Sequence, residues 1–261
     1  MTAASQVLPA DYQPRPDLLK DKVILITGAA DGIGHALAVA AGGCGATVVL
    51  LDKDVRRLEL TYDAIEKAGG PQPAIYPLNL EGANPDDHAE LAAVVERDLG
   101  ALHGLVHNAA SLGKPAPIDI YDIEAWYRVL QVNLSAPFLL TRACLPLLRK
   151  SGEASVLFMS DEVGRRGKAY WGAYGVTKSG LEGFMRILAV ELASTAIRVN
   201  SVDPGPVRTA LRRSAYPGED AQALPLPAQA AQSLLYLLGP DGRDLHGQQL
   251  RLELERPSIR A

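Results

Sequence analysis

The sequence has little cysteine, no long apolar run and no excess of positive charge, and each shortage excludes a class of protein. Its 261 residues include only two cysteines, Cys44 and Cys144, which lie far apart in helix-like stretches. Buried free thiols are therefore expected rather than a disulfide framework. No apolar run approaches the length of a membrane span. His, Cys and acidic residues show no metal-ligand spacing, so no metal is expected.

The charge of the chain is weakly negative, with a formal net charge of −4 at pH 7. Nucleic acids and anionic membranes attract a basic face, so neither is expected as a partner. Residues 1–22 lack the apolar core of a signal peptide. We therefore expect a cytoplasmic protein that acts on a small molecule.

Short β-branched runs alternate along the chain with longer amphipathic ones. The predicted strands are 22–27, 47–52, 74–78, 102–108, 154–160, 197–202 and 248–253. The predicted helices lie near 32–42, 54–68, 85–98, 124–149, 171–194 and 228–238. Continuous apolar strands separated by helices imply a parallel sheet covered on both faces. The expected class is a doubly wound α/β fold with a seven-stranded sheet.

One domain spanning residues 1–261 is expected, because hydrophobic residues make up 48% of the chain and no boundary is visible. The long irregular stretches are an N-terminal arm (1–20), residues 109–123 and residues 205–227. The last two follow strands at their carboxyl ends. Folds of this class place their binding crevice at that edge of the sheet.

The first long strand runs into the stretch TGAADGIG, residues 27–34. Gly28, Gly32 and Gly34 lie where the strand turns into a helix, so backbone N–H groups can approach a pyrophosphate. Asp52 ends the next strand, 18 residues after Gly34, which is the spacing of a ribose-binding acid. A dinucleotide site is the interpretation. A Gly-rich turn without a ligand, with Asp52 as a solvated strand end, is the alternative.

Asp52 also bears on the choice of dinucleotide. A carboxylate there accepts hydrogen bonds from the ribose diol and repels a 2′-phosphate, so NAD is expected rather than NADP. Lys53 works against this preference, because a cation at the next position partly neutralises the acid.

Five stretches carry a resemblance to a known family: the glycine pattern at 27–34, HNAA at 107–110, VNLSAPF around Asn133, YGVTK at 174–178 and PGPVRT at 204–209. In this order, and over nearly the whole chain, they resemble the short-chain dehydrogenase/reductase family. The stretch GRRGKAYWGAY also looks like its bacterial YciK-like branch. The resemblance implies a Rossmann fold and hydride transfer between a nicotinamide cofactor and a carbonyl/alcohol substrate.

The resemblance also assigns site residues. Those implied to bind the cofactor are Gly28, Asp31, Gly32, Ile33, Gly34, Asp52, Asn79, Leu80, Asn108, Ala109, Tyr174, Lys178, Pro204, Gly205, Val207 and Thr209. Asn133 would hold a proton-relay water through its helix backbone, although it could also be a helix surface amide. Residues 205–227 would form a lid over the substrate. Asn79 stands where the family usually has an acid, and its amide oxygen can still accept a hydrogen bond.

Tyr174 is interpreted as an acid/base and Lys178 as the residue that activates it. Residues i and i+4 share one face of a helix, so the lysine can lie beneath the tyrosine. A phenol with a pKa of about 10 is a poor acid or base at neutral pH, and a nearby ammonium lowers that pKa. By the resemblance, the tyrosine exchanges a proton while the nicotinamide exchanges a hydride.

Asp161 departs from the family pattern, which places a serine 13 residues before the tyrosine. Ser160 is one residue away and could substitute only if the backbone bulges. An ionised Asp161 about 4 Å from the reacting oxygen would cost about 4 kcal/mol at an effective dielectric near 20. A protonated Asp161 could instead donate as the serine does, and Arg165 and Arg166 could neutralise the acid.

The sequence therefore predicts an oxidoreductase, with a second possibility from another class. Because Asp161 replaces the catalytic serine, the chain could be a dinucleotide-binding protein with little or no turnover, a sensor or a scaffold. The long helices at 124–149 and 171–194 resemble those through which family members pair. A homodimer or homotetramer is expected.

Overall fold

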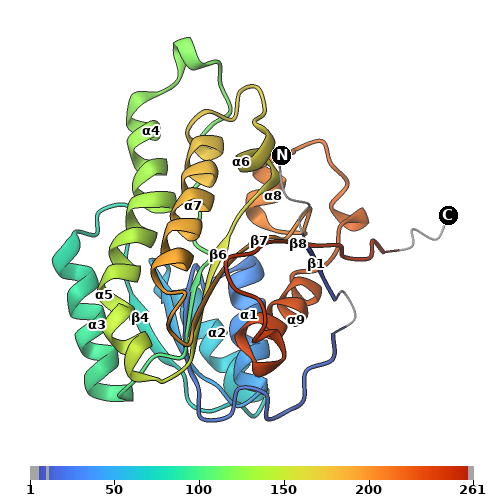
Figure 1. Ribbon diagram of the computed structural model, residues 1–261. Coiled ribbons are helices and arrows are strands. Elements are labelled where there is room, and N and C mark those ends of the chain that lie inside the picture. The colour runs from blue at the N-terminus through green and yellow to red at the C-terminus, as the bar shows by residue number, and fades with distance from the viewer. Residues whose placement is uncertain (1–5, 10–11, 258–261) are drawn as a thin grey trace.

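A parallel sheet flanked by helices forms the body of the protein in a computed structural model, which describes residues 6–9 and 12–257 (Figure 1). The strands are β1 (Gln6–Leu8), β2 (Val23–Thr27), β3 (Thr47–Asp52), β4 (Ala74–Pro77), β5 (Gly104–His107), β6 (Ala154–Met159), β7 (Ile197–Asp203) and β8 (Gln249–Leu252). The α-helices are α1 (Gly32–Gly43), α2 (Val55–Lys67), α3 (Pro85–Leu99), α4 (Ile123–Leu130), α5 (Ala136–Lys150), α6 (Glu162–Arg166), α7 (Gly172–Glu191), α8 (Ala210–Ala215) and α9 (Pro227–Leu238).

The order of the strands places a crevice at one edge of the sheet. That order is β1-β8-β7-β6-β5-β2-β3-β4, and neighbouring strands run parallel. The chain runs outward from β2 through β3 to β4 and then returns to β5 on the other side of β2. Where the strand order reverses in this way, folds of this kind leave a crevice at the carboxyl ends of the strands.

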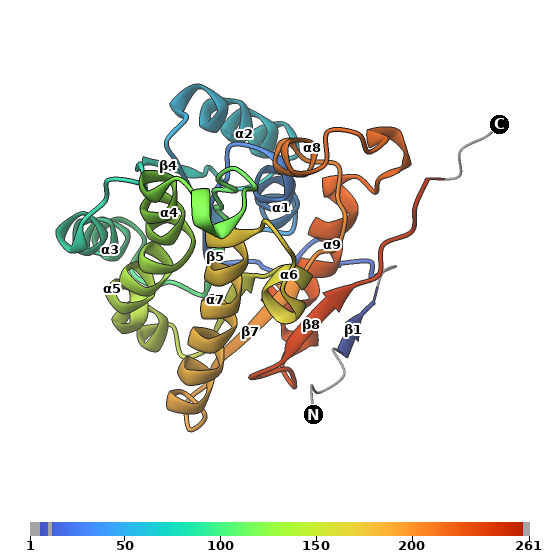
Figure 2. The same ribbon diagram turned by 90° about the horizontal axis from the view of Figure 1, so that it is seen from above.

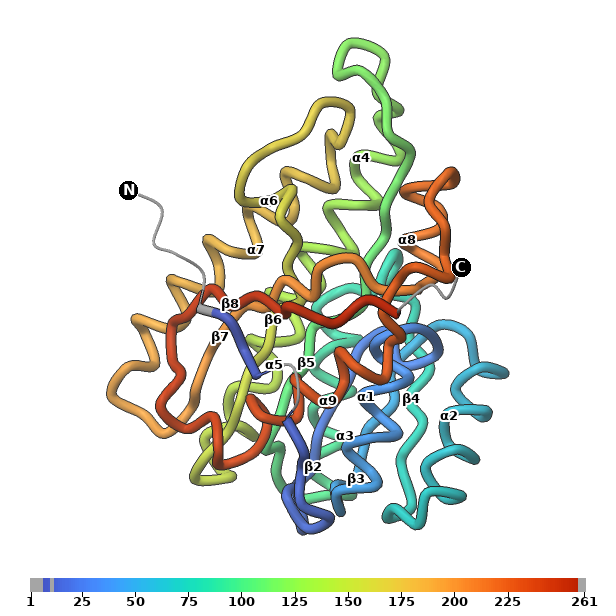
Figure 3. Tube along the Cα trace, turned by 90° about the vertical axis from the view of Figure 1, so that its right-hand side faces the viewer, coloured from blue at the N-terminus to red at the C-terminus, as the bar shows by residue number. Residues whose placement is uncertain are grey.

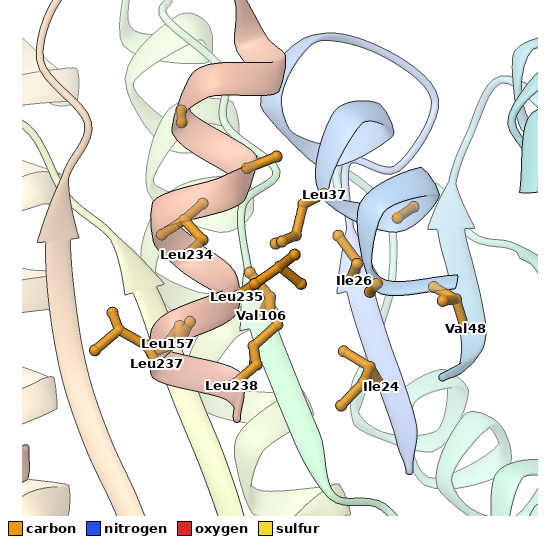
Figure 4. Close-up of a cluster of buried hydrophobic side chains, with 14 of the residues drawn as sticks. Ile24, Ile26, Leu37, Val48, Val106, Leu157, Leu234, Leu235, Leu237 and Leu238 are labelled. Carbon is orange, nitrogen blue, oxygen red and sulfur yellow. The ribbon is translucent and has the colours of Figure 1, made fainter. Parts of the chain in front are cut away.

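Two apolar layers cover the two faces of the sheet, because successive strand residues point to opposite sides. Ile24 and Ile26 pack with α1, α2 and α9, whereas Leu25 between them packs with α3, α5 and α7. Figure 4 shows the first layer, in which Leu37 of α1 and the leucines of α9 lie over the sheet. Seen from above, the two groups of helices lie on opposite sides of the strands (Figure 2). These layers fix the positions of the strand ends.

The sheet has eight strands, so the predicted count of seven was wrong. The additional strand, β1, comes from the predicted N-terminal arm and pairs in parallel with β8 (Figure 3). Leu8 is 3% exposed in the layer that contains α9, while its neighbour Val7 is 46% exposed. A strand of three residues is too short for alternation to be recognised in the sequence.

Other differences concern the helices near the crevice. The predicted helix 124–149 is divided into α4 and α5 by a π-helical segment, η2 (Gln131–Ser135). The irregular stretch 109–123 contains a 3₁₀ turn, η1 (Ile118–Ile120), and the predicted lid 205–227 contains α8 and a second 3₁₀ turn, η3 (Ala221–Ala223). A third 3₁₀ turn, η4 (Pro240–Gly242), follows α9.

Both cysteines are buried free thiols, as predicted. Burial raises the pKa of Cys144 to about 12. Among the described residues, no helix is both long enough and apolar enough to cross a membrane. The same residues contain no group of three or more His, Cys, Asp or Glu side chains able to hold a metal ion.

The burial of Leu8 predicts that β1 contributes to stability. Leu8→Ala should lower the free energy of unfolding by about 2–3 kcal/mol, because it removes a buried side chain from the layer beneath α9. Val7→Ala, on the exposed side of the same strand, should cost less than about 0.5 kcal/mol. Urea unfolding of the two variants measures the difference, and equally small effects would contradict the pairing of β1 with the sheet.

Candidate active site

A cavity of about 410 Å³ opens at the carboxyl ends of the central strands. Its lining includes residues that end or directly follow β2, β3, β5 and β7, namely Gly28, Asp52, Asn108 and Pro204. The reversal of strand order between β2 and β5 predicts a crevice at this place. The cavity is therefore the main candidate for a binding site in the described part of the chain.

The structure brings most of the predicted site residues to this one cavity. Those that line it are Gly28, Asp31, Gly32, Ile33, Asp52, Asn79, Leu80, Asn108, Ala109, Ser160, Asp161, Tyr174, Lys178, Pro204, Gly205, Val207 and Thr209. Gly34 and Asn133 are not part of the lining. Gly34 lies beneath the turn after β2, and Asn133 lies behind Ser111.

The turn after β2 is closed tightly around Asn108. The side-chain amide of Asn108 donates to the carbonyls of Thr27, at 3.0 Å, and Gly28, at 3.2 Å. Gly28 has a φ of +68°, and a Cβ on Gly34 would lie 2.1 Å from the oxygen of Gly28. Larger residues cannot occupy these positions without opening the turn. The turn leads directly into α1, whose N-terminus suits a phosphate group.

Acids and their partners surround the end of the cavity near β3. Asp52 accepts a hydrogen bond from the backbone of Asp54 at 3.1 Å. Lys53, the cation beside Asp52, pairs with Glu81 at 2.8 Å. Arg57 pairs with Asp31, which caps α1, at 3.0 Å.

Asn79 lies on the same side of the cavity. Its side-chain oxygen accepts from the backbone N–H of Glu81 at 3.1 Å. An amide oxygen has two lone pairs, so one acceptor position is left for a ligand.

Tyr174 and Lys178 lie one turn apart on α7, and each is 4% exposed. The ammonium of Lys178 lies 5.4 Å from the centre of the Tyr174 ring and donates to the carbonyl of Met159 at 2.6 Å. Burial lowers the pKa of Lys178 to about 8, although Asp161, Asp203 and Glu182 act in the opposite direction. The pair lies on one face of α7 as the sequence predicts, but the expected lowering of the Tyr174 pKa is wrong, because burial and then Asp161 raise it.

Asp161 contacts the phenol of Tyr174. One carboxylate oxygen, Oδ2, lies 3.2 Å from the Tyr174 hydroxyl, which donates to it. The other, Oδ1, accepts from the backbone N–H of Val163 at 2.9 Å and caps α6. The pKa of Tyr174 lies well above its ordinary value, mainly through burial and then through the charge of Asp161. The acid therefore belongs to the same group as the tyrosine and the lysine.

Ser160 forms a hydrogen bond with a different carboxylate, that of Glu182. Its hydroxyl donates to Glu182 at 2.5 Å. Glu182 is 2% exposed and also accepts from Arg165 at 2.8 Å, from Ser201 at 2.6 Å and from Gln249 at 2.7 Å. Burial raises the pKa of Glu182, but these hydrogen bonds and the charge of Arg165 lower it below its ordinary value. Ser160 thus faces Glu182, while its neighbour Asp161 faces Tyr174.

Asn133 is a buried amide in the π-helical segment η2, and its interpretation as a helix surface amide was wrong. It is 2% exposed. Its side-chain oxygen accepts from the backbone of Ser111 at 2.7 Å, and its nitrogen donates to the Ser111 carbonyl at 2.9 Å and to Thr177 at 3.1 Å. Asn133 therefore ties the chain after β5 to α7, close to Tyr174.

Two acids near the Tyr174–Lys178 pair were missed in the sequence, Asp203 and Glu182. Asp203 is 5% exposed at the end of β7 and accepts from the backbone of Gly205 at 2.9 Å. Burial raises its pKa, and the charge of Asp161 acts in the same direction. Asp203 directly follows the predicted strand 197–202, and Glu182 follows Lys178 by four residues on the same helix face. Both signals were present in the sequence.

Aromatic side chains form the wall of the cavity next to Tyr174. The ring centres of Trp171 and Tyr174 are 5.6 Å apart, and those of Trp171 and Tyr216 are 5.5 Å apart. The ammonium of Lys168 lies 4.6 Å from the Tyr216 ring. Arg212 stacks on the same ring at 3.7 Å and pairs with Glu219. This wall suits an apolar or aromatic part of a ligand.

The strand order, the cavity and the Tyr174–Lys178 pair define a Rossmann-like α/β protein with a site suited to a dinucleotide. Comparison with known proteins identifies the family. Residues 22–220 match the family model described as short chain dehydrogenase. The chain belongs to this oxidoreductase family.

Relatives of high similarity support the assignment. The chain is 42% identical to the uncharacterised oxidoreductase YciK of Escherichia coli K12, over 89% of this chain and 92% of YciK. A short-chain dehydrogenase structure from Pseudomonas syringae is 48% identical with a TM-score of 0.90, and the match covers 92% of this chain and 98% of that one. A structure from Escherichia coli CFT073, complexed with NADPH, is 42% identical with a TM-score of 0.89, over 91% and 99% of the two chains.

The close approach at Gly34 predicts a specific loss of binding. Gly34→Ala should weaken the binding of NADH and NADPH at least about tenfold, because the new Cβ forces the turn after β2 to open. Gly43→Ala is the control, since a Cβ at that end of α1 meets no atom within 4 Å. Isothermal titration with each cofactor measures the effect. Unchanged affinity in the Gly34 variant would show that this turn does not hold the cofactor.

Proposed function

We propose that the protein exchanges a hydride between a nicotinamide cofactor and a carbonyl/alcohol substrate, with Tyr174 as the acid/base. The observation that carries the proposal is the pair of buried side chains Tyr174 and Lys178, one helical turn apart in the strand-end cavity. The cofactor, when bound, supplies or accepts the hydride. The relative solved with NADPH and the family match support a nicotinamide cofactor for this chain.

The residues around the cavity fit such a cofactor. The backbone at Gly28, Gly32 and the start of α1 would hold the pyrophosphate. The close packing at Gly34 keeps this backbone accessible to the phosphates. Asp52 would accept from the adenosine ribose, and Lys178 would hold the second ribose. The adenine would lie beside Asn79 and Leu80. The nicotinamide would lie beside Ala109, Pro204, Gly205, Val207 and Thr209, under the lid formed by 205–227.

Tyr174 is placed to donate a proton. Because its pKa is raised above its ordinary value, the phenol is protonated at neutral pH. A protonated phenol can protonate the oxygen of a carbonyl substrate as it is reduced. Asn133 would hold the proton relay that reprotonates Tyr174. It lies in the π-helical segment η2, where i→i+5 hydrogen bonding changes the pattern of backbone carbonyls.

The hydrogen bond between Tyr174 and Asp161 favours a second candidate function. Asp161 accepts the phenol proton of Tyr174, so a carboxylate lies where a carbonyl oxygen would gain negative charge. A protein that binds the dinucleotide with little or no turnover, as a sensor or scaffold, is consistent with this contact. Cofactor binding without any turnover by the natural protein would favour it.

The role of Tyr174 is tested by removing its hydroxyl. Tyr174→Phe should lower turnover of any accepted alcohol or ketone by at least about 100-fold, because the proton donor is lost. Cofactor affinity should stay nearly unchanged, since the glycine turn and Lys178 remain. Tyr170→Phe, at a position 61% exposed, is the control. Steady-state rates and cofactor titrations measure both effects. If the Tyr174→Phe variant turned over as fast as the natural protein, Tyr174 would not be the acid/base.

For the cofactor, we propose a preference for NAD(H). A 2′-phosphate would face the Asp52 carboxylate, and the cations beside it, Lys53 and Arg57, are already paired with acids. The NADPH complex of the relative points the other way. NAD(H) should bind this chain several-fold more tightly than NADP(H), and Asp52→Ala should narrow the gap.

The measurement is a titration of both dinucleotides into the natural protein, Asp52→Ala and Glu59→Ala. Glu59 is an exposed acid on α2, so its variant controls for a general change in charge. Equal affinities in the natural protein, or tighter binding of NADP(H), would refute the assignment to Asp52.

We also propose a cytoplasmic homodimer or homotetramer. Helices α4, α5 and α7 expose large apolar side chains, namely Ile123, Tyr127, Phe138, Val176, Ile187 and Val190. Exposed apolar surface of this kind is typical of interfaces between copies. Ring contact between Phe138 and Phe184 joins α5 to α7 on this side.

Light scattering tests the assembly. The natural protein should be dimeric or tetrameric at micromolar concentration, and Ile187→Glu should shift it toward the monomer by burying a charge in the interface. Leu60→Glu on α2 is a matched control, since Leu60 and Ile187 are both 61% exposed. A natural protein that is monomeric would end the proposal.

A further inference from the structure

Beside the Tyr174 phenol, the reacting end of the cavity presents an acceptor, Asp161, where the family pattern has a second donor. Both carboxylate oxygens of Asp161 accept hydrogen bonds, Oδ2 from Tyr174 and Oδ1 from Val163. An ionised carboxylate has only acceptor positions. A carbonyl oxygen also has only acceptor positions, so it meets Asp161 without a proton between them.

A second acid, Asp203, adds to the negative potential at this place when it is ionised, although burial raises its pKa and Arg165 and Arg251 lie within range of its charge. Asp203 is almost fully buried, and its charge acts on the phenol of Tyr174 in the same direction as that of Asp161. A carbonyl oxygen gains negative charge as it is reduced, which two nearby carboxylates oppose. A substrate atom that carries positive charge and an N–H group is attracted instead.

The cations nearby weaken this negative potential, but the hydrogen bonds that the two oxygens of Asp161 accept come from Tyr174 and Val163. The ammonium of Lys178 lines the same cavity and acts on Asp161, while it donates to the carbonyl of Met159 at 2.6 Å. Arg212 pairs with Glu219 through two short hydrogen bonds at 2.6 and 2.8 Å. The acid in direct contact with the reacting phenol is Asp161.

We propose that the preferred substrate presents a carbon–nitrogen double bond, as a protonated imine, and that the reverse substrate is the corresponding amine. This inference deepens the proposed hydride transfer and rests on it. Asp161 accepts the N–H of the substrate, in the place where the family's serine would donate to an oxygen. Asp161 thereby selects nitrogen over oxygen at the reacting centre.

The reaction balances without a proton donor. A hydride added to the iminium carbon forms a C–H bond, and the π pair of the carbon–nitrogen bond becomes the lone pair of a neutral amine. The two electrons come from the reduced nicotinamide, which is oxidised. The positive charge next to Asp161 is lost as the hydride is added, so the carboxylate stabilises and orients the bound cation and not the neutral product. Tyr174 then exchanges a proton with the amine nitrogen.

The aromatic wall indicates the rest of the substrate. Trp171 and Tyr216 lie beside Tyr174. Lys168 and Arg212 of the chain already stack on these rings, so the wall suits an apolar or aromatic part of the substrate and not its charged group. A cyclic imine attached to an apolar or aromatic ring fits this combination of acids and rings.

The first test is binding and needs no turnover. Aminotetralin, a cation at neutral pH, and tetralol, its neutral alcohol counterpart, are titrated calorimetrically into the protein with and without NADH. The amine should bind at least about tenfold more tightly. Asp161→Asn should abolish this preference, whereas Glu162→Gln, which neutralises the exposed acid next to it, should preserve it. Equal affinity for the two probes in the natural protein would overturn the inference.

The second test is reduction of dihydroisoquinoline, an imine, against tetralone, a ketone. The natural protein should favour the imine in kcat/KM, and Asp161→Ser should shift the preference toward the ketone. Ketone reduction with no imine reduction, unaffected by Asp161→Ser, would overturn the inference and leave the proposed hydride transfer standing. Reduction of neither probe would overturn the inference, whatever the binding preference, because the inference rests on hydride transfer to the imine.

Discussion

The buried carboxylate of Glu182 determines the arrangement of the active site. It accepts hydrogen bonds from Ser160, which directly follows β6, from residues on β7 and β8, and from Arg165 on α6, while it belongs to α7 itself. Removing one partner from such a group leaves buried charge uncompensated, which is strongly destabilising. Glu182 therefore fixes α7, with Tyr174 and Lys178, against the ends of the strands. The same contact occupies Ser160, so Asp161 is the residue of the strand-end pair that faces Tyr174.

The chemistry of the site follows from the fact that Asp161, and not its neighbour Ser160, faces Tyr174. In the family pattern a hydroxyl donates to the substrate, whereas here a carboxylate accepts from the phenol of Tyr174, the proposed acid/base, and a second acid, Asp203, lies nearby. The phenol holds its proton more firmly, and the centre attracts positive charge. The fold supplies the position of the dinucleotide, and the acids supply the preference for the second substrate. These two contributions come from opposite ends of the same cavity.

Much of the fold and part of the site could be predicted from the sequence, because their signals are local. The seven longer strands, the glycine turn and the Tyr174–Lys178 pair each depend on spacing along a few residues. β1 was missed because three residues give no periodicity. The hydrogen bond of Ser160 to Glu182 could not be predicted, because the two residues meet only when α7 packs on the sheet. The positions of Asp203 and Glu182 at a strand end and on a helix face were visible in the sequence, but their proximity to Asp161 and Lys178 depends on tertiary packing. The interruption of the helix at Gln131–Ser135 likewise gave no sequence signal.

The titration of the Tyr174 phenol tests the central claim most directly, because the account holds that burial and Asp161 keep it protonated. The phenolate of Tyr174 is measured as the difference in ultraviolet absorbance between the natural protein and the Tyr174→Phe variant as pH rises. We predict no Tyr174 phenolate up to about pH 10, the ordinary pKa of tyrosine, and an earlier titration when Asp161 is replaced by Ser. A phenolate that forms between about pH 7 and 9 in the natural protein, or a titration unaffected by Asp161→Ser, would contradict the account.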